Sequence, residues 1–334
     1  MTLIPAAFIL ILTTLFAYMG TRALLPVLTA RAILDHPNER SSHHTPTPRG
    51  GGIAVVAVLI AAWIGIGFYM QDGPVVVWAV PAAALVLAAV SLVDDLRTLG
   101  PLVRLVIQGL AAGVILYVMP GDALYFQGLL PATVDTIVAG VVWVWFINLF
   151  NFMDGIDGIT GVETLGIGAG LAIIVFMIGT TDTQSLGLYG LAAAGVALGF
   201  LKMNWHPAKI FMGDVGSVPL GFLLGWLLLS LAASGAWAAA LILPSYYLCD
   251  ATVTLVRRAA RGEKIWRPHR LHFYQAAVQR GMDHGAVSMQ VLSVNGALII
   301  LAAVAVSGQV TTALVIATVV NIAFLFRLAR GSGA

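Results

Sequence analysis

Long runs of hydrophobic residues recur along the chain, and short polar segments separate them. Each run is about 17 to 23 residues long, the length an α-helix needs to cross about 30 Å of hydrocarbon. About eleven transmembrane helices are predicted, at 2–24, 52–70, 75–93, 102–119, 133–150, 161–179, 186–201, 217–234, 236–256, 287–307 and 310–327. The pattern therefore predicts an all-α fold, a polytopic membrane helical bundle.

The composition agrees with this pattern. Of the 334 residues, 60% are hydrophobic and only 10% are charged, which is too little polar surface for a soluble globule of this size. The largest polar segments, 25–51 and 257–286, are too short to fold as separate domains. We therefore expect residues 1–334 to form a single transmembrane domain.

Positive charge lies on one side of the predicted membrane. All 17 Lys and Arg residues fall in or next to the segments 25–51, 94–101, 151–160, 202–216, 257–286 and the tail from 328. The charged residues of the alternate connections are all acidic, namely Asp72, Asp122 and Asp182. By the positive-inside rule the basic segments are cytoplasmic, with the N-terminus outside and the C-terminus inside.

Polar residues whose side chains are suited to catalysis or ligand binding gather at the predicted cytoplasmic helix ends. Asp94 and Asp95 follow the third span, at a helix C-terminus that disfavours negative charge. Adjacent carboxylates repel, so one can act as a base, or the two can share a cation. Neutralisation by Arg97 is the alternative interpretation.

The second polar group lies at the inner end of the fifth span. Asn148, Asn151, Asp154 and Asp157 occur there with two glycines, again where a helix dipole disfavours carboxylates. This favours a ligand or a metal ion. The alternative is a turn between two helices that uses Asp-Gly pairs.

A third group, from Phe211 to Ser217, leads into the eighth span. A helix N-terminus beside two glycines can hold phosphate, and Asp214 beside phosphate indicates a divalent cation. Asp214 could equally be an ordinary N-cap.

Two basic segments complete the set. His269, Arg270 and His272 are predicted to clamp an anion, because Arg binds phosphate oxygens with two hydrogen bonds. A segment that interacts with anionic membrane lipid, or a histidine zinc site lacking a third ligand, is the alternative. Three glycines after Arg49 suit close approach of backbone to a ligand, or a flexible entry to a helix.

Oxygen ligands for a hard cation, a helix N-terminus and Arg and His donors at one membrane depth together indicate Mg²⁺-assisted phosphoryl transfer. A site at the inner surface suits a lipid phosphate acceptor and a water-soluble donor. A secondary transporter is the main competing class, but its ionisable residues would lie near the bilayer midplane. A non-catalytic lipid-binding scaffold would leave the paired acids unexplained.

Five motifs in order resemble those of the polyprenyl-phosphate N-acetylhexosamine-1-phosphate transferases, the glycosyltransferase 4 family, which includes the phospho-N-acetylmuramoyl-pentapeptide translocase. They are ThrProThrProArgGlyGlyGly, the AspAsp pair, AsnPheMetAspGlyIleAspGly, PheMetGlyAspValGlySer and HisArgLeuHis. The resemblance implies that an oxygen of undecaprenyl phosphate attacks the β-phosphorus of a UDP-N-acetylhexosamine and releases UMP. It also implies a cytoplasmic active site in the cell inner membrane, Mg²⁺ that Mn²⁺ can replace, and no nucleic-acid partner. A homodimer is compatible with the sequence.

The resemblance also implies roles for individual residues. Asp94 would activate or orient the lipid phosphate with Asp95, while Asp214 and Asn151 would bind the metal. The remaining expected site residues are Asp154 and Asp157 in the catalytic set and, for substrate binding, His43, Thr47, Arg49, Asn148, Asn204, Phe211, His269, Arg270 and His272.

The HisArgLeuHis motif carries fewer histidines than the pentapeptide translocase and the enterobacterial N-acetylglucosamine enzymes. In this it is similar to members that begin O-antigen or other surface polysaccharides in the lipopolysaccharide layer. Some of these transfer a 6-deoxy amino sugar in place of N-acetylglucosamine. The sugar is therefore open, and the pentapeptide transferase is the alternative within the family.

Overall fold

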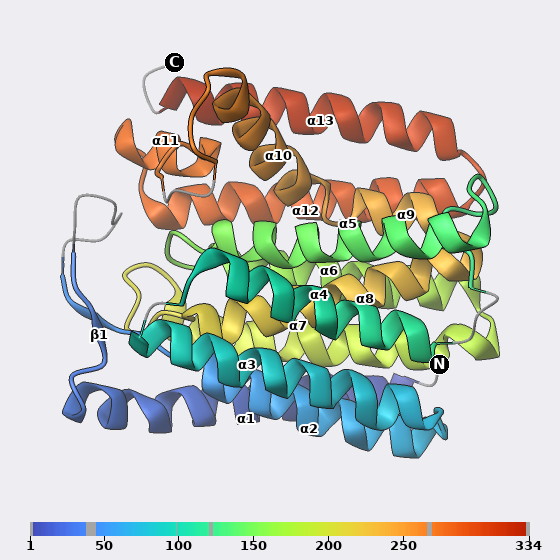
Figure 1. Cartoon of the computed structure of the whole chain (residues 1–334), viewed down its shortest axis with the longest axis horizontal. Coiled ribbons are helices and arrows are strands. Elements are labelled where there is room, and N and C mark those ends of the chain that lie inside the picture. Colours follow the sequence, from blue (N-terminus) through green and yellow to red (C-terminus); the bar gives the residue numbers. More distant parts are fainter. Residues whose placement is uncertain (1–2, 38–44, 98, 120–122, 266–268, 332–334) are drawn as a thin grey trace.

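The computed structural model describes residues 3–37, 45–97, 99–119, 123–265 and 269–331. It is a helical bundle whose long helices lie roughly side by side (Figure 1). The helices are α1 (Leu3–Ala30), α2 (Gly52–Met70), α3 (Val80–Arg97), α4 (Pro101–Val118), α5 (Ala132–Phe152), α6 (Ile159–Ile178), α7 (Gln184–Asn204), α8 (Asp214–Leu231), α9 (Trp237–Ile242), α10 (Ser245–Ala260), α11 (Phe273–Gln279), α12 (His284–Val306) and α13 (Val310–Arg330).

Only one small sheet occurs in the described part of the chain. Strands β1 (Leu34–Asp35) and β2 (Thr47–Pro48) pair antiparallel between α1 and α2. A π-helical turn, Val75–Ala79, leads into α3. The predicted all-α membrane bundle is therefore confirmed.

Within the residues that the structure describes, ten helical segments are long and apolar enough to cross a membrane. Most predicted spans agree with them to within a few residues, and 52–70 coincides with α2. The prediction for 236–256 is wrong in one respect, because this segment is two helices, α9 and α10, separated at Leu243 and Pro244. Proline lacks the amide N–H that would continue the helix.

The chain nevertheless passes through the bundle an odd number of times. The N and C marks show that α1 begins and α13 ends at opposite ends of the bundle (Figure 1). The chain turns at Gly235, whose φ of 97° favours glycine, and α9 then packs against α8 and α12. Together α9 and α10 run back along the bundle, and an eleventh membrane crossing there remains a prediction.

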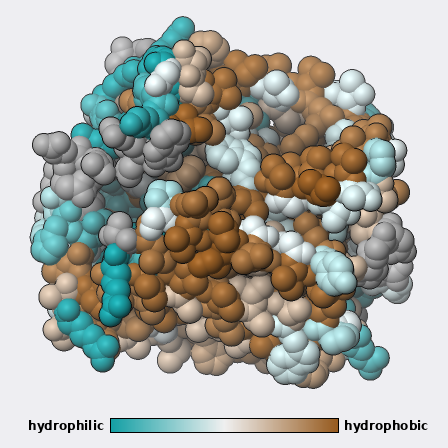
Figure 2. Space-filling model, viewed as in Figure 1, coloured by the Kyte–Doolittle hydropathy of each residue, from teal (hydrophilic) through white to brown (hydrophobic). Residues whose placement is uncertain are grey.

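The core of the bundle is formed by α6, α7 and α8. The most hydrophobic 18-residue windows of these segments are 67%, 83% and 89% buried, against 17% in both α1 and α4. The exposed faces of the outer helices are apolar, as Figure 2 shows across the middle of the molecule, whereas hydrophilic residues gather at its left edge. Apolar surface of this extent is stable only in contact with lipid.

Candidate active site

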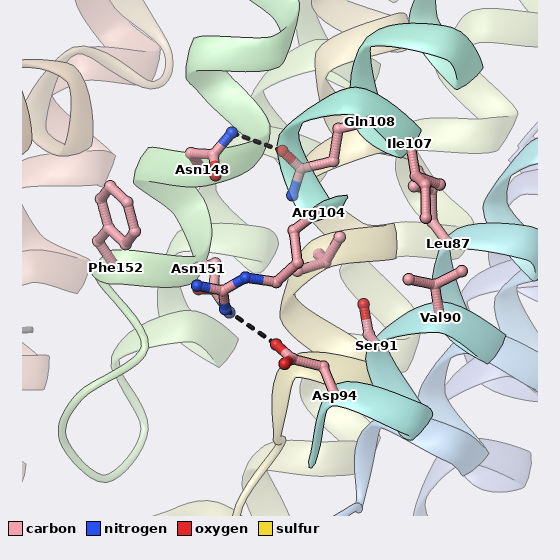
Figure 3. A pocket seen from close by; sticks show the side chains of 11 residues that line it. Leu87, Val90, Ser91, Asp94, Arg104, Ile107, Gln108, Asn148, Asn151 and Phe152 are labelled. Atoms are coloured by element: carbon pink, nitrogen blue, oxygen red, sulfur yellow. Dashed lines mark hydrogen bonds and ion pairs between the residues drawn. The ribbon is translucent and has the colours of Figure 1, made fainter. Parts of the chain in front are cut away.

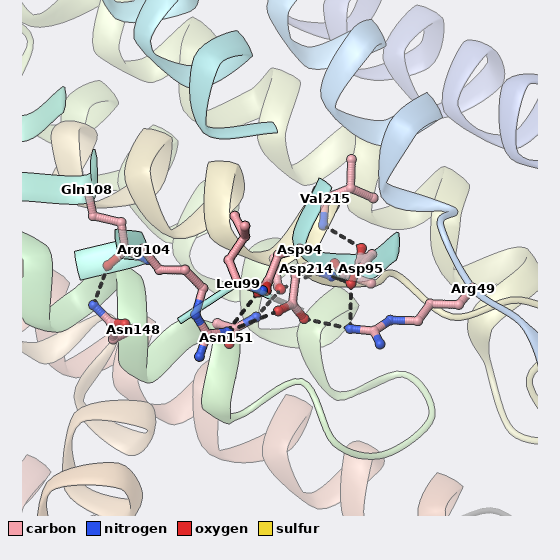
Figure 4. A network of polar contacts seen from close by, with 12 residues as sticks. Arg49, Asp94, Asp95, Leu99, Arg104, Gln108, Asn148, Asn151, Asp214 and Val215 are labelled. Carbon is pink, nitrogen blue, oxygen red and sulfur yellow. Dashed lines mark hydrogen bonds and ion pairs between the residues drawn. The ribbon is translucent and has the colours of Figure 1, made fainter. Parts of the chain in front are cut away.

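Acidic, amide and guanidinium side chains from five segments meet at the polar end of the bundle (Figure 4). Asp94 and Asp95 come from the end of α3, Asp214 from the first turn of α8 and Asn151 from the end of α5. The arginines come from the loop before α2 and from α4, and are Arg49 and Arg104. The predicted convergence of Asp94, Asp95 and Asp214 is present, and Arg104 joins it as a residue that no motif had singled out.

Asp95 caps the N-terminus of α8. Its carboxylate accepts the backbone N–H of Val215 at 3.1 Å and that of Asp214 at 3.4 Å. The helix begins at Asp214, so the N-cap interpretation of that side chain is wrong. The first amides of α8 are also engaged by a carboxylate and are not free for phosphate. A carboxylate at this position is favoured because the helix dipole is positive there.

Asp214 lies between two guanidinium groups. Arg49 Nη2 lies 2.7 Å from Oδ1 of Asp214 and also 2.7 Å from Oδ1 of Asp95. Arg104 Nη1 lies 3.7 Å from Oδ2 of Asp214 and 2.9 Å from Oδ2 of Asp94. The acidic pair is therefore neutralised by Arg49 and Arg104, and the interpretation through Arg97 is not needed. Five charged groups of alternating sign form one connected network.

Asp94 is buried and held by two donors. Besides Arg104, the backbone N–H of Leu99 donates to Oδ1 of Asp94. This contact joins Leu99 to the end of α3 and holds the carboxylate beside the cleft next to the network. Asp94 thus has a defined orientation before any substrate arrives.

A narrow cleft opens beside Asp94 between α3, α4 and α5 (Figure 3). Its polar lining consists of Asp94, Arg104 and the amides of Gln108, Asn148 and Asn151, with Ser91 among apolar side chains. Nδ2 of Asn148 donates to Oε1 of Gln108 at 2.6 Å. The cleft thus joins the charged network to an apolar, membrane-spanning part of the bundle.

Asn151 is oriented by Ser217 of α8, which accepts a hydrogen bond from its Nδ2 at 2.9 Å. This leaves the carbonyl oxygen of Asn151 as an available acceptor beside Asp214. A carboxylate oxygen and a carboxamide oxygen are ligands that Mg²⁺ prefers. Because two carboxylates here already require a shared cationic partner, the residues present fit a divalent ion.

The three glycines after Arg49 lie close to protein backbone. The amides of Gly50 and Gly51 donate to the carbonyl of Phe211, and Gly52 donates to Met212. A Cβ atom on Gly52 would lie 2.2 Å from Cα of Gly216 at the start of α8. Glycine at 52 therefore lets the loop carrying Arg49 join the loop carrying Asp214.

Among the expected substrate-binding residues nearby, Thr47 is buried in β2 and donates to the carbonyl of Thr45. Phe211 is half-buried, and its backbone N–H donates to Pro48. These residues fix the loop geometry beside the network. His43 lies outside the described residues.

A second polar cluster surrounds Asp157. Oδ2 of Asp157 contacts Nδ1 of His206 at 2.6 Å and accepts the N–H of Ala208, while Oδ1 lies 3.3 Å from Nδ1 of His284. Nε2 of His206 contacts Asp283 at 3.0 Å. Burial raises the pKa of the Asp157 carboxyl, but its hydrogen bonds with His284, His206 and Ala208 outweigh burial, so this pKa lies below the ordinary value. Asp157 is thus held as an anion.

Asn204 supports the same region. Its Oδ1 accepts the N–H of Gly158 and its Nδ2 donates to the carbonyl of Ile210, each at 2.9 Å. The side chain therefore joins the loop after α5 to the loop before α8.

Asp154 has a different environment. The hydroxyl of Thr160 donates to its Oδ1. Burial raises the pKa of the Asp154 carboxyl to about 6, against the lowering effect of Thr160. Near neutral pH this group therefore titrates more readily than an ordinary aspartate.

The HisArgLeuHis segment is anchored by Asp250, whose role the sequence did not indicate. The Asp250 carboxylate accepts the N–H groups of Phe273 and Tyr274 at 2.9 and 3.2 Å and contacts Nδ1 of His272 at 3.3 Å. Tyr274 in turn donates to the carbonyl of Phe152 at 3.0 Å. Asp250 thus caps α11 and fixes this segment against the end of α5.

The two histidines of this segment differ from simple cationic clamps. His272 is buried and its ring stacks on Tyr274. Burial, with smaller effects of His272 and Arg258, lowers the pKa of His269 to about 4, so it is neutral at pH 7. Nδ1 of His269 accepts the N–H of Leu271, which leaves a proton on Nε2 for donation. Arg270 is the permanent positive charge of the motif.

Comparison with known proteins identifies the family. Residues 77–232 match the model of "Glycosyl transferase family 4". The chain is 30% identical over 312 residues to the decaprenyl-phosphate N-acetylglucosaminephosphotransferase of Mycobacterium tuberculosis, covering 82% of this chain and 76% of that protein. The decaprenyl-phosphate N-acetylglucosaminephosphotransferase of Mycolicibacterium smegmatis is 32% identical over 288 residues, covering 75% of this chain and 69% of that protein.

A third relative is more distant. The undecaprenyl-phosphate alpha-N-acetylglucosaminyl 1-phosphate transferase of Escherichia coli K12 is 26% identical over 288 residues, covering 82% of this chain and 75% of that protein. The family match, 77–232, includes Asp94, Asp95, Arg104 and Asp214 of the charged network. The chain belongs to glycosyl transferase family 4.

Proposed function

We propose that the protein transfers an N-acetylhexosamine 1-phosphate from a UDP-sugar to undecaprenyl phosphate, releasing UMP and beginning a lipid-linked surface polysaccharide. The names of its relatives state transfer of N-acetylglucosamine phosphate to decaprenyl or undecaprenyl phosphate. The observation that carries the proposal is the network of Asp94, Asp95, Asp214 and two arginines beside a cleft at one end of a membrane bundle.

The acceptor phosphate would enter the cleft between α3, α4 and α5. Arg104 and Gln108 offer hydrogen-bond donors there, and Leu87, Val90 and Ile107 offer apolar surface for the adjoining prenyl chain. A phosphate oxygen forms a bond to the β-phosphorus of the donor while the bond from that phosphorus to the bridging oxygen breaks. UMP leaves with the bridging oxygen and its electron pair. Asp94 would orient the acceptor or take a proton from it.

The donor diphosphate would lie beside Asp214. Asp214 and Asn151 would hold Mg²⁺, or Mn²⁺ in its place, which supplies neutralisation of the charge on the diphosphate. Arg49 and Arg104 would add guanidinium donors that bind phosphate oxygens. The role of Asp95 is to hold the start of α8, and with it Asp214, in position.

The nucleotide and sugar would occupy the loops around this centre. Asp157 follows α5, Asn204 ends α7 and Phe211 precedes α8, which suits contacts with the uridine. His269, Arg270 and His272, fixed by Asp250, would contact the diphosphate or the sugar. These assignments follow the family resemblance and give N-acetylglucosamine or a 6-deoxy amino sugar as the transferred group.

The polar end of the bundle is proposed to face the cytoplasm across the cell inner membrane. The basic side chains of α10 and α13, Arg257, Arg258, Arg327 and Arg330, lie in the last turns of those helices at this end. Positively charged loops are retained on the cytoplasmic side during insertion. This orientation gives a soluble UDP-sugar direct access to the site.

A donor panel tests the proposal. The purified protein with undecaprenyl phosphate, Mg²⁺ and each of several UDP-N-acetylhexosamines is expected to release UMP and form a lipid-linked product with at least one donor. Asp214→Asn and Asp94→Asn are expected to lower turnover at least 100-fold while the protein stays folded. Asp72→Asn is the matched control, and its turnover is expected to be normal. Asp72 lies at the opposite end of the bundle, where its carboxylate accepts a hydrogen bond from the Tyr189 hydroxyl. Near-normal turnover in both site variants would contradict the assignment.

A further inference from the structure

The resting site contains a cation of its own. One nitrogen of Arg49 lies 2.7 Å from an oxygen of Asp95 and 2.7 Å from an oxygen of Asp214. A single positive group equidistant from two carboxylates has the place that a bridging metal ion takes in other proteins. Burial lowers the pKa of the guanidinium, but Asp214 and Asp95 outweigh it and raise the pKa above the ordinary value, so Arg49 is always charged.

Both oxygens of Asp214 face arginines. Arg49 contacts Oδ1, and Arg104 lies 3.7 Å from Oδ2 while making a shorter bond of 2.9 Å to Asp94. A divalent ion on Asp214 would experience repulsion from both guanidinium groups at close range. Arg104 keeps its nearer partner, Asp94, if Asp214 binds a metal. Arg49 lies 2.7 Å from Asp214 and Arg104 lies 3.7 Å from it, so Arg49 is the group that must move.

The structure gives Arg49 room to move. Its side chain is 34% exposed, and it follows β2 and precedes Gly50, whose φ is 118°. Gly213, also at positive φ, lies next to Arg49. A Cβ atom at this position would lie 3.2 Å from Cγ of Arg49, and glycine has no such atom. The Arg49 side chain is thus partly open to solvent and is not enclosed at Gly213.

We infer that Arg49 is a built-in competitor of the divalent cation, which leaves Asp214 when metal binds and transfers to the donor diphosphate. This inference rests on the proposed function. When metal binds alone, Arg49 loses one of its two carboxylate partners and keeps only Asp95, whereas metal together with a diphosphate gives Arg49 a new anionic partner in place of Asp214. Divalent cation and nucleotide therefore bind cooperatively, each increasing the affinity of the other by the same factor.

Mn²⁺ binding to the full-length protein in detergent, measured by electron paramagnetic resonance with and without UDP, tests the inference without turnover. For the unaltered protein UDP is expected to tighten Mn²⁺ binding at least tenfold. Arg49→Gln is expected to bind Mn²⁺ about tenfold tighter without UDP, and UDP then adds less than threefold, as coupling factors of 5 to 150 are typical of linked sites. Arg49→Lys keeps the charge and the weak metal binding. Arg22→Gln, an exposed arginine of α1, controls for net charge.

The outcomes separate the two proposals. If Arg49→Gln binds Mn²⁺ no more tightly than the unaltered protein in the absence of UDP, the competition inference is wrong. Asp214→Asn tests the metal site itself, and it is expected to lose Mn²⁺ binding in both conditions. Unchanged Mn²⁺ binding in Asp214→Asn would overturn the metal assignment of the proposed function, whatever Arg49 does.

Discussion

Replacing Asp95 tests the observation that this carboxylate caps α8. Asp95→Ala removes the acceptor of two backbone N–H groups, those of Val215 at 3.1 Å and Asp214 at 3.4 Å, and leaves them buried beside Arg49. Hydrogen bonds to charged groups contribute about 1.5–3 kcal/mol, and N-cap substitutions cost about 0.5–2 kcal/mol. Because the second bond is long and Asp214 loses a repulsive neighbour, we expect a net cost of about 2 kcal/mol.

The assay is thermal unfolding of the purified protein in detergent, followed by tryptophan fluorescence. A loss of about 2 kcal/mol corresponds to a decrease in Tm of roughly 4–8 °C. Asp95→Asn keeps an oxygen that can accept the Val215 N–H, so its Tm is expected to lie between those of Asp95→Ala and the unaltered protein. Asp95→Ala with a Tm within about 1 °C of the unaltered protein would refute the capping role.

Three further predictions concern the periphery of the site. Asp250→Ala removes the acceptor for two N–H groups of α11, so we expect the KM for the UDP-sugar to rise about tenfold or more while the KM for the lipid changes little in steady-state assays. Gln108→Leu removes a polar group from the cleft. We expect the KM for undecaprenyl phosphate to rise about tenfold, which corresponds to the loss of roughly one hydrogen bond, and the KM for the donor to stay unchanged. Burial raises the pKa of Asp154 to about 6, so the folded protein holds this proton more tightly than the unfolded chain, and the resulting stability is lost as pH rises from about 4 through 6. Asp154→Asn cannot ionise and should therefore raise the Tm at pH 7.5 but not at pH 4; an equal shift at both pH values would contradict this.

The sequence predicts the bundle well because each crossing must be apolar over its whole length. The length of an apolar segment does not, however, show where the helix within that segment is interrupted. Segment 236–256 is apolar throughout its first half, and the break at Pro244 depends on packing of α9 against α8 and α12. Proline in the run was the available signal.

The site is predictable to the level of which helix ends meet. Asp94, Asp95, Asp214 and Asn151 were expected together because their helix ends lie on one side of the membrane, and the structure brings them together. Which group partners which depends on helix arrangement, so the capping of α8 by Asp95 was not foreseen. The same holds for Asp250, although a carboxylate inside a membrane helix indicates a buried partner.

His206 and His284 were also missed as partners of Asp157. They are 78 residues apart in the sequence and approach each other only because the loop before α8 lies against the start of α12. The position of His206 in the segment between Asn204 and Phe211 was the available signal. Spacing alone cannot predict contacts of this kind between distant segments.

Transfer of the β-phosphorus of the donor to lipid is the most direct test of the proposed chemistry. UDP-N-acetylglucosamine, or whichever donor of the panel is active, is labelled with ³²P at the β position and incubated with the protein, undecaprenyl phosphate and Mg²⁺. Sugar-phosphate transfer predicts that the label enters the lipid fraction in equal amount to the UMP released, and that Asp214→Asn abolishes both. Label that stays with UDP while the sugar alone enters the lipid would contradict the account.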